Sequence, residues 1–264
     1  MTMTESVLFS VDDRGVATVC LNKPDMHNAF DDSLIAELTR LFNQIANDDN
    51  IRAMVLAGNG KSFCAGADLN WMRRMASYTY EENVEDAKGL ATMLKTLNEL
   101  PKPTIARVQG AAYGGAIGLI ACCDVAIASK LTKFCLSEVK LGLIPATISP
   151  YVIEAMGARV SRRYFATAEV FSARRARRLG LVSEAVNEDE LDENVELIIK
   201  NLLRNSPAAV AAAKQLVTDV KGRPMDDALL EMTSVRIAEI RGSEEGQEGL
   251  KAFLEKRKPN WIQE

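Results

Sequence analysis

Histidine is almost absent from this sequence. The 264 residues include one histidine, His27, which lies in a polar stretch. A Ser-His-Asp triad needs a histidine as its base, so any such triad would have to use this residue. We interpret His27 as an ordinary solvated loop residue, and the sequence excludes mechanisms that need two histidines.

Cysteine is scarce as well and lacks a metal-binding pattern. An odd number of cysteines, without C-x-x-C spacing and without histidine partners, suits small buried residues in a reducing compartment. There are five: Cys20, Cys64, Cys122, Cys123 and Cys135. We therefore expect neither a disulfide framework nor a metal site.

The sequence also has no long apolar run and no excess of basic residues. The longest nearly apolar run, 111–123, ends at Asp124 and is too short to cross a bilayer as a helix. A net charge of −4 provides no basic field for nucleic acid or an anionic membrane. Residues 1–15 show neither a secretory signal nor a transit peptide, which predicts a cytoplasmic protein.

What is present is an alternation of strand-like and helix-like segments, in a chain with 47% hydrophobic and 26% charged residues. The patterns predict strands at 7–11, 16–21, 52–57, 104–108 and 125–128, and helices at 33–47, 81–100 and 116–122. This alternation predicts an α/β fold. Consecutive helices follow at 191–204, 208–220, 225–241 and 244–258. We divide the chain into a core, 1–203, and a helical C-terminal region, 204–264.

The most informative segment is QGAAYGGAIGLIACCDVAIAS, residues 109–129. Tyr113, Gly114 and Gly115 interrupt an apolar run where a predicted strand turns into a helix. Glycine permits unusual dihedrals and close approach, and the first turn of a helix has unpaired N–H groups and a partial positive charge. Such a turn can stabilise a negatively charged oxygen. Tight packing of the strand on the helix is an equally good interpretation of this turn alone.

Two further segments supply possible chemistry. FCAGADL, residues 63–69, also follows a predicted strand, so the amides of Ala67 and Gly115 could form a two-donor oxyanion hole. Glu138 lies among apolar residues in SEVKLGLIP and is the candidate acid–base, with Lys140 nearby. The alternative is a surface glutamate that shares one face of an amphipathic strand with Lys140.

Five motifs, in this order, resemble the enoyl-CoA hydratase/isomerase (crotonase) family over essentially the whole chain: FCAGADL, QGAAYGGAIGLIACCDVAIAS, FCLSEVKLGLIP, ARRARRLGLVSEAV and KAFLEKRKP. The resemblance implies a spiral of repeated ββα units with a helical C-terminal trimerisation region. It also implies an acyl-CoA thioester substrate and a homotrimer or a hexamer of two trimers. Coenzyme A would be part of the substrate, so no separate cofactor is expected.

The resemblance also assigns roles to residues. The amides of Ala67 and Gly115 would receive the thioester oxygen. Phe253 and Lys256 match positions that often reach the nucleotide, sometimes from a neighbouring subunit, although cations also favour helix C-termini. The other residues expected at the substrate are Met26, Asn28, Ala29, Ala65, Gly66, Asp68, Leu69, Tyr113, Gly114 and Gly118.

Apolar ligand sites are lined by aromatic and thioether side chains, so Trp71, Met72 and Tyr113 are candidates for the acyl-pocket wall. Each would suit the core equally well. Arg73 and Arg74 are candidates to meet a substrate carboxylate, although helix surfaces carry such residues routinely.

The sequence departs from the family pattern at one position. Family hydratases generally hold water between two glutamates; Glu138 matches the second, but Gly118 stands at the first position. We expect the space and the charge vacated at Gly118 to be supplied partly by substrate or by a bound water.

The resemblance favours hydration of an enoyl-CoA or the reverse dehydration. In detail it is strongest to bacterial 3-methylglutaconyl-CoA hydratase and carboxygeranoyl-CoA hydratase-like members, which act in leucine and terpene catabolism. Two alternatives remain open. One is a double-bond isomerase that needs a single glutamate, and the other is a non-catalytic acyl-CoA binding protein.

Overall fold

A computed structural model describes residues 5–262, so the first four residues of the expected core lie outside the described part. The predicted α/β architecture is confirmed. A six-stranded sheet has the order β1-β2-β3-β4-β6-β9, in which β1 is antiparallel to β2 and all other neighbours are parallel. Its strands are β1 Val7–Val11, β2 Val16–Leu21, β3 Ala53–Gly58, β4 Thr104–Val108, β6 Val125–Ser129 and β9 Glu184–Val186.

A smaller sheet lies beside the first. It pairs β5 (Ala111–Tyr113) in parallel with β7 (Lys133–Cys135), which is antiparallel to β8 (Phe171–Ser172). These strands are two or three residues long, and the sequence patterns did not predict them.

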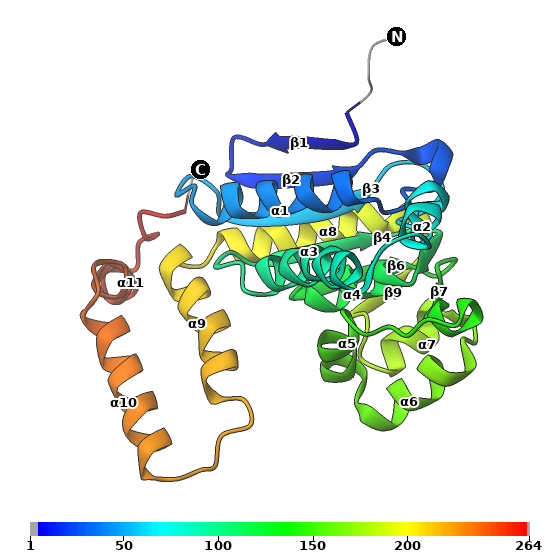
Figure 1. Cartoon of the computed structure of the whole chain (residues 1–264). Helices are drawn as coiled ribbons and strands as arrows, with labels where there is room; N and C mark the ends of the chain where they lie inside the picture. Colours follow the sequence, from blue (N-terminus) through cyan, green and yellow to red (C-terminus); the bar gives the residue numbers. More distant parts are fainter. Residues whose placement is uncertain (1–4, 263–264) are drawn as a thin grey trace.

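Helices cover both faces of the large sheet (Figure 1). On one face lie α1 (Asp32–Ala46), α3 (Tyr80–Asn98) and α4 (Gly115–Cys122), whose buried side chains join the main core. The side chain of Asp31 caps α1 by accepting from the Leu34 N–H. On the other face, α8 (Leu191–Leu203) packs against strand residues such as Val55 and Ile105. Burial on both faces is what a parallel sheet requires.

Shorter helices lie in the connections between these elements: η1 Pro24–Met26, α2 Leu69–Met75, η2 Glu138–Leu141, α5 Ser149–Met156, α6 Ala158–Thr167, α7 Ala173–Arg178 and η3 Glu188–Glu190. The segment around Glu138 is therefore a 3₁₀ helix, and the strand that we weighed for it is wrong. Its left-handed end at Gly142, with φ of 73°, closes this turn, a conformation that glycine adopts without strain.

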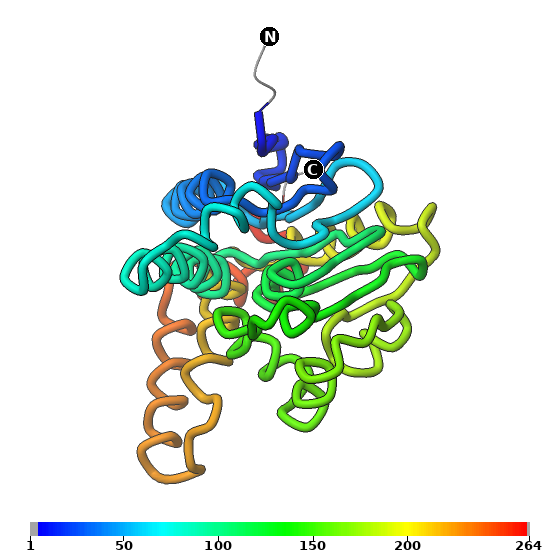
Figure 2. The backbone as a smooth tube through the Cα atoms, turned by 45° about the vertical axis from the view of Figure 1, so that its right-hand side comes forward, coloured from blue at the N-terminus to red at the C-terminus, as the bar shows by residue number. Residues whose placement is uncertain are grey.

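The last three helices extend away from the large sheet as an arm, which both views show (Figures 1 and 2). They are α9 Pro207–Val220, α10 Asp227–Gly242 and α11 Glu244–Glu255. Ser206 caps α9 and Pro207 takes its first position, as predicted. The last helix is shorter than predicted because Lys256 adopts a left-handed conformation (φ 56°).

The order of the parallel strands positions the candidate site. β2, β3 and β4 run in the same direction, so the loops that follow Leu21, Gly58 and Val108 leave the same edge of the sheet. Ligands of α/β proteins commonly bind at this carboxyl edge.

Candidate functional site

The loop after β3 is held against the loop after β2. Phe30 donates its N–H to Gly66 O at 2.8 Å and accepts from the Asp68 N–H at 2.6 Å. These two bonds use the residues on either side of Ala67, whose own N–H has no acceptor in residues 5–262. An unpaired backbone donor at a loop surface is available to a ligand.

The same loop is bridged to β5, which leads into the glycine turn. The Cys64 N–H bonds to Ala111 O at 3.1 Å, and the Tyr113 N–H bonds to Cys64 O at 3.0 Å. A Cβ added at Gly66 would lie 3.7 Å from Tyr113 O. The two glycine-bearing loops therefore lie side by side. The N–H groups of Ala67 and Gly115 can bind one oxygen only if the loops are arranged in this way.

Gly114 gives the glycine turn its shape. Its dihedrals, φ 55° and ψ −124°, are accessible only to glycine, and its N–H bonds to Cys135 O at 2.9 Å. Gly115 is the first residue of α4, so no intrahelical acceptor is available for its N–H, and the described chain offers no other. Phe30 lies against it, 3.3 Å from the position of an added Cβ.

Glu138 lies next to the glycine turn. The Gly114 N–H bonds to Cys135 O at the end of β7, and the 3₁₀ helix η2, which begins at Glu138, follows β7 in the chain. A Cβ added at Gly114 would lie 3.5 Å from Glu138 Oε1. Glu138 Oε2 is buried and has no hydrogen-bond partner in the described chain. Burial raises the pKa of this carboxyl group, opposed by a hydrogen bond from its own backbone. The ammonium of exposed Lys140 is turned to Cys135 Sγ, at 3.9 Å.

Gly118 does not leave an open space. A Cβ added there would lie 2.3 Å from Ile148 Cγ2 and 3.3 Å from Leu94 Cδ2. Ile148 is only 1% exposed, and its side chain fills the position that a larger residue at 118 would need. The expectation that substrate or water takes this space is therefore wrong, because an apolar side chain occupies it.

Two polar residues expected at the coenzyme bond to the protein's own backbone. Asn28 is fully buried and donates to the carbonyls of Asn59, Ser62 and Phe63, which fixes the loop before Ala67. Asp68 caps α2 by accepting from the N–H groups of the residues two and three positions on. Around them, Ala29 and Ala65 are half-buried, and Met26 and Leu69 are exposed.

The candidates for the acyl-pocket wall differ from one another. Trp71 is 5% exposed and its Nε1–H bonds to Asp86 on α3, which makes it a core residue, whereas Met72 and Tyr113 are half-buried. Neither arginine of α2 is free, because Arg73 donates to the Asn70 side chain and Arg74 pairs with Asp32.

Phe253 and Lys256 lie far from these groups. Figure 1 shows α11 on the opposite side of the molecule from α2 and β7. Phe253 is 82% exposed, and Lys256 is the exposed C-cap of α11. Within one chain, neither residue reaches the glycine turn.

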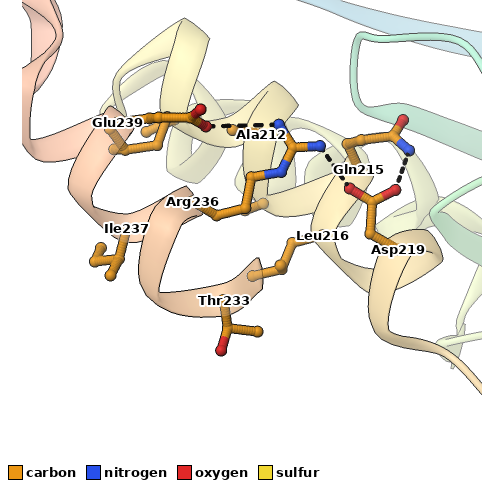
Figure 3. Close-up of a pocket in the computed structure, with 11 residues that line it drawn as sticks. Ala212, Gln215, Leu216, Asp219, Thr233, Arg236, Ile237 and Glu239 are labelled. Carbon is orange, nitrogen blue, oxygen red and sulfur yellow. Dashed lines mark hydrogen bonds and ion pairs between the residues drawn. The ribbon is translucent and has the colours of Figure 1, made fainter. Parts of the chain in front are cut away.

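The C-terminal arm contains a separate cavity of about 310 Å³ between α9 and α10 (Figure 3). Its walls are mainly apolar, and its polar groups pair with one another: Arg236 with Asp219, and Gln215 with Asp219. It contains no group of the glycine turn and belongs to the helical arm.

Two observations concern absence, and a third concerns the Cys64 thiol. Within residues 5–262, no cluster of histidine, cysteine or acidic side chains is arranged to hold a metal ion. None of the helices found there is long and apolar enough to cross a membrane. Burial raises the pKa of the Cys64 thiol, beside the site, to about 12, which keeps it protonated and unreactive.

Three residues around the glycine turn and η2 were missed from the sequence: Ser137, Ile148 and Arg162. Ser137 stood in the quoted motif but was read only as the neighbour of Glu138. Ile148 and Arg162 could not be found by spacing, because packing brings them in: Ile148 meets Gly118 where α5 packs on α4, and Arg162 lies beside Val139 where α6 packs on η2.

Comparison with known proteins gives consistent matches. The model of the family described as "Enoyl-CoA hydratase/isomerase" matches residues 12–264. A solved enoyl-CoA hydratase from Shewanella pealeana superposes with a TM-score of 0.94 at 48% identity, covering 98% of this chain and 97% of that one.

Two curated relatives have different activities in their names. The short-chain-enoyl-CoA hydratase of Clostridium acetobutylicum is 32% identical, covering 92% of each chain. The 1,2-epoxyphenylacetyl-CoA isomerase of Escherichia coli is 30% identical, covering 98% of this chain and 99% of its own.

Proposed function

Because the chain belongs to the enoyl-CoA hydratase/isomerase family and has its crotonase fold, we propose that it adds water to the 2,3 double bond of an enoyl-CoA, or removes it. In this proposal Glu138 is the acid–base, and the N–H groups of Ala67 and Gly115 hold the thioester oxygen. One observation carries this proposal: the half-buried carboxylate of Glu138 lies beside Gly114, and the next residue, Gly115, has a free N–H.

The chemistry follows from these three groups. Glu138 takes a proton from water as the water oxygen bonds to C3 of the enoyl group, and the displaced electrons move to the thioester oxygen. The two N–H groups and the N-terminus of α4 stabilise the resulting enolate. Glu138 then returns the proton to C2, the carbonyl re-forms, and one water has been added.

The runner-up function is double-bond isomerisation. It is favoured by one observation, the apolar side chain of Ile148 over Gly118, since a proton shift needs one carboxylate and no bound water. A non-catalytic acyl-CoA binding protein is the remaining alternative. The raised pKa of Glu138 argues against it, because proton-transfer groups commonly have such shifts.

For the acyl group, we propose a branched substrate with a second carboxylate, similar to methylglutaconyl-CoA, in leucine or terpene catabolism. The support is an apolar groove of about 500 Å³ beside η2, lined by Val139, Ile144 and Phe165 among others. Arg162 of α6 also lines it and has no ion-pair partner among residues 5–262. A single cation beside an apolar groove suits a short apolar chain that ends in a carboxylate.

For the assembly, we propose a homotrimer or a hexamer of two trimers, in the cytoplasm. The support is the helical arm, which exposes several large apolar side chains, and exposed apolar patches commonly mark protein–protein interfaces. They include Val217, Leu230, Ile237, Leu250, Phe253 and Leu254.

The test is a panel of enoyl-CoA thioesters incubated with the purified protein and read by the mass of the product. The proposal expects a 3-hydroxyacyl-CoA, with methylglutaconyl-CoA turned over more efficiently than crotonyl-CoA. Products of unchanged mass with a moved double bond would establish the isomerase instead. Binding without any product would establish the non-catalytic alternative.

A further inference from the structure

The space beside Gly114 is bordered by two side-chain oxygens, of which the reaction above uses one. A Cβ added at Gly114 would lie 3.5 Å from Glu138 Oε1 and 4.0 Å from Ser137 Oγ. Both distances are ordinary van der Waals contacts or longer, so the glycine leaves this space free. A small molecule slightly farther from the backbone would lie between the two oxygens.

The Ser137 hydroxyl is not used by the protein. Serine at the start of a helix usually accepts a backbone N–H, but Ser137 makes no such bond to η2. No other group in residues 5–262 hydrogen-bonds to its Oγ, although the residue is half-buried. Buried polar atoms are mostly paired in folded proteins, so the buried, unpartnered Oε2 of Glu138, next in the chain to this unused hydroxyl, points to a partner from outside the chain.

Of the three atoms in residues 5–262 nearest to a Cβ added at Gly114, the two polar ones are Glu138 Oε1 and Ser137 Oγ. Gly118 has no side chain, and Ile148 and Leu94 close that side of the site. Lys140, on the same turn as Glu138, has its ammonium at Cys135 Sγ. The side-chain oxygens of Ser137 and Glu138 therefore lie together beside Gly114.

We propose that Ser137 positions the water that adds to the double bond. Its Oγ accepts one hydrogen of the water while Glu138 accepts the other and removes it as a proton. One of the two lone pairs of the water oxygen is then directed at C3. This inference rests on the proposed hydratase function. Ser137 makes the second contact with the water, which Gly118 cannot make because it has no side chain.

The test compares two reactions of the same protein. Hydration of an enoyl-CoA needs the positioned water. Exchange of the C2 hydrogens of butyryl-CoA with D₂O needs only Glu138 and the two N–H donors. For Ser137→Ala we expect kcat for hydration to fall about tenfold or more, from the loss of a hydrogen bond worth about 1.4 kcal/mol, with the exchange rate unchanged. Ser137→Thr keeps the hydroxyl and should restore most of the hydration rate.

Ser10→Ala, which removes an exposed hydroxyl on β1, is the control and should change neither reaction. The inference is overturned if Ser137→Ala hydrates as fast as the unchanged protein. It is also overturned if hydration and exchange fall together, because that result indicates a structural role. If the unchanged protein exchanges C2 hydrogens but never forms a 3-hydroxyacyl-CoA, the hydratase function itself fails, and the role of Ser137 fails with it.

Discussion

Replacing Gly118 with alanine tests whether this position is closed. Within a helix alanine is favoured over glycine by about 1 kcal/mol. At Gly118 the added Cβ would lie 2.3 Å from Cγ2 of the buried Ile148, and such overpacking costs about 1–3 kcal/mol. The clash should outweigh the propensity gain, so we expect a net loss of roughly 1 kcal/mol in the free energy of unfolding.

Gly89 provides the matched control. It lies in α3, is exposed, and an added Cβ would meet nothing within 4 Å. Gly89→Ala should therefore raise the free energy of unfolding by about 0.5–1 kcal/mol. Urea unfolding at one protein concentration, followed by circular dichroism, measures both variants.

A double-mutant cycle assigns the effect to the contact with Ile148. Ile148→Ala alone should cost about 2–5 kcal/mol through the cavity it leaves. In the double variant the methyl group added at position 118 enters that cavity, so the combined loss should be smaller than the sum by about 1 kcal/mol or more. If Gly118→Ala instead stabilises the protein as Gly89→Ala does, position 118 is open and our account of the missing glutamate is refuted.

Three further predictions concern the site. Burial raises the pKa of Glu138, and hydration needs its ionised form. As the pH is lowered, kcat/KM should therefore begin to fall at a higher pH than it would with an ordinary glutamate, which a pH–rate profile checks. Gly114→Ala should cost about 1–3 kcal/mol of stability, measured by urea unfolding, because its φ of 55° and ψ of −124° strain a side-chain-bearing residue. Arg162→Met should lower kcat/KM for methylglutaconyl-CoA about tenfold and leave crotonyl-CoA unchanged, whereas Arg159→Met, outside the groove on the same helix, should change neither.

Local patterns were sufficient to predict much of the large sheet and its helices. The spacing of Leu34, Leu38, Leu41 and Ile45 predicted α1, because this periodicity places them on one buried face. The strand at 104–108 was predicted with its observed bounds. The short strands of the second sheet were missed, since two or three residues are too few to show a periodic pattern.

The arrangement of the site was harder to predict, because it depends on contacts between residues distant in the sequence. The glycine turn and Glu138 were recognisable from their motifs. That Ile148 fills the space over Gly118 is a packing fact which no local pattern shows. For the same reason, the cap made by Asp68 and the buried bonds of Asn28 gave these residues structural roles that the resemblance did not suggest.

Incubation of an enoyl-CoA with the protein in H₂¹⁸O tests the central claim most directly. We predict a 3-hydroxyacyl-CoA that contains one ¹⁸O atom, and a loss of at least a hundredfold in its rate of formation for Glu138→Gln, since general acid–base groups contribute about 10²–10⁴-fold. A product without ¹⁸O, or undiminished incorporation by Glu138→Gln, would contradict the account.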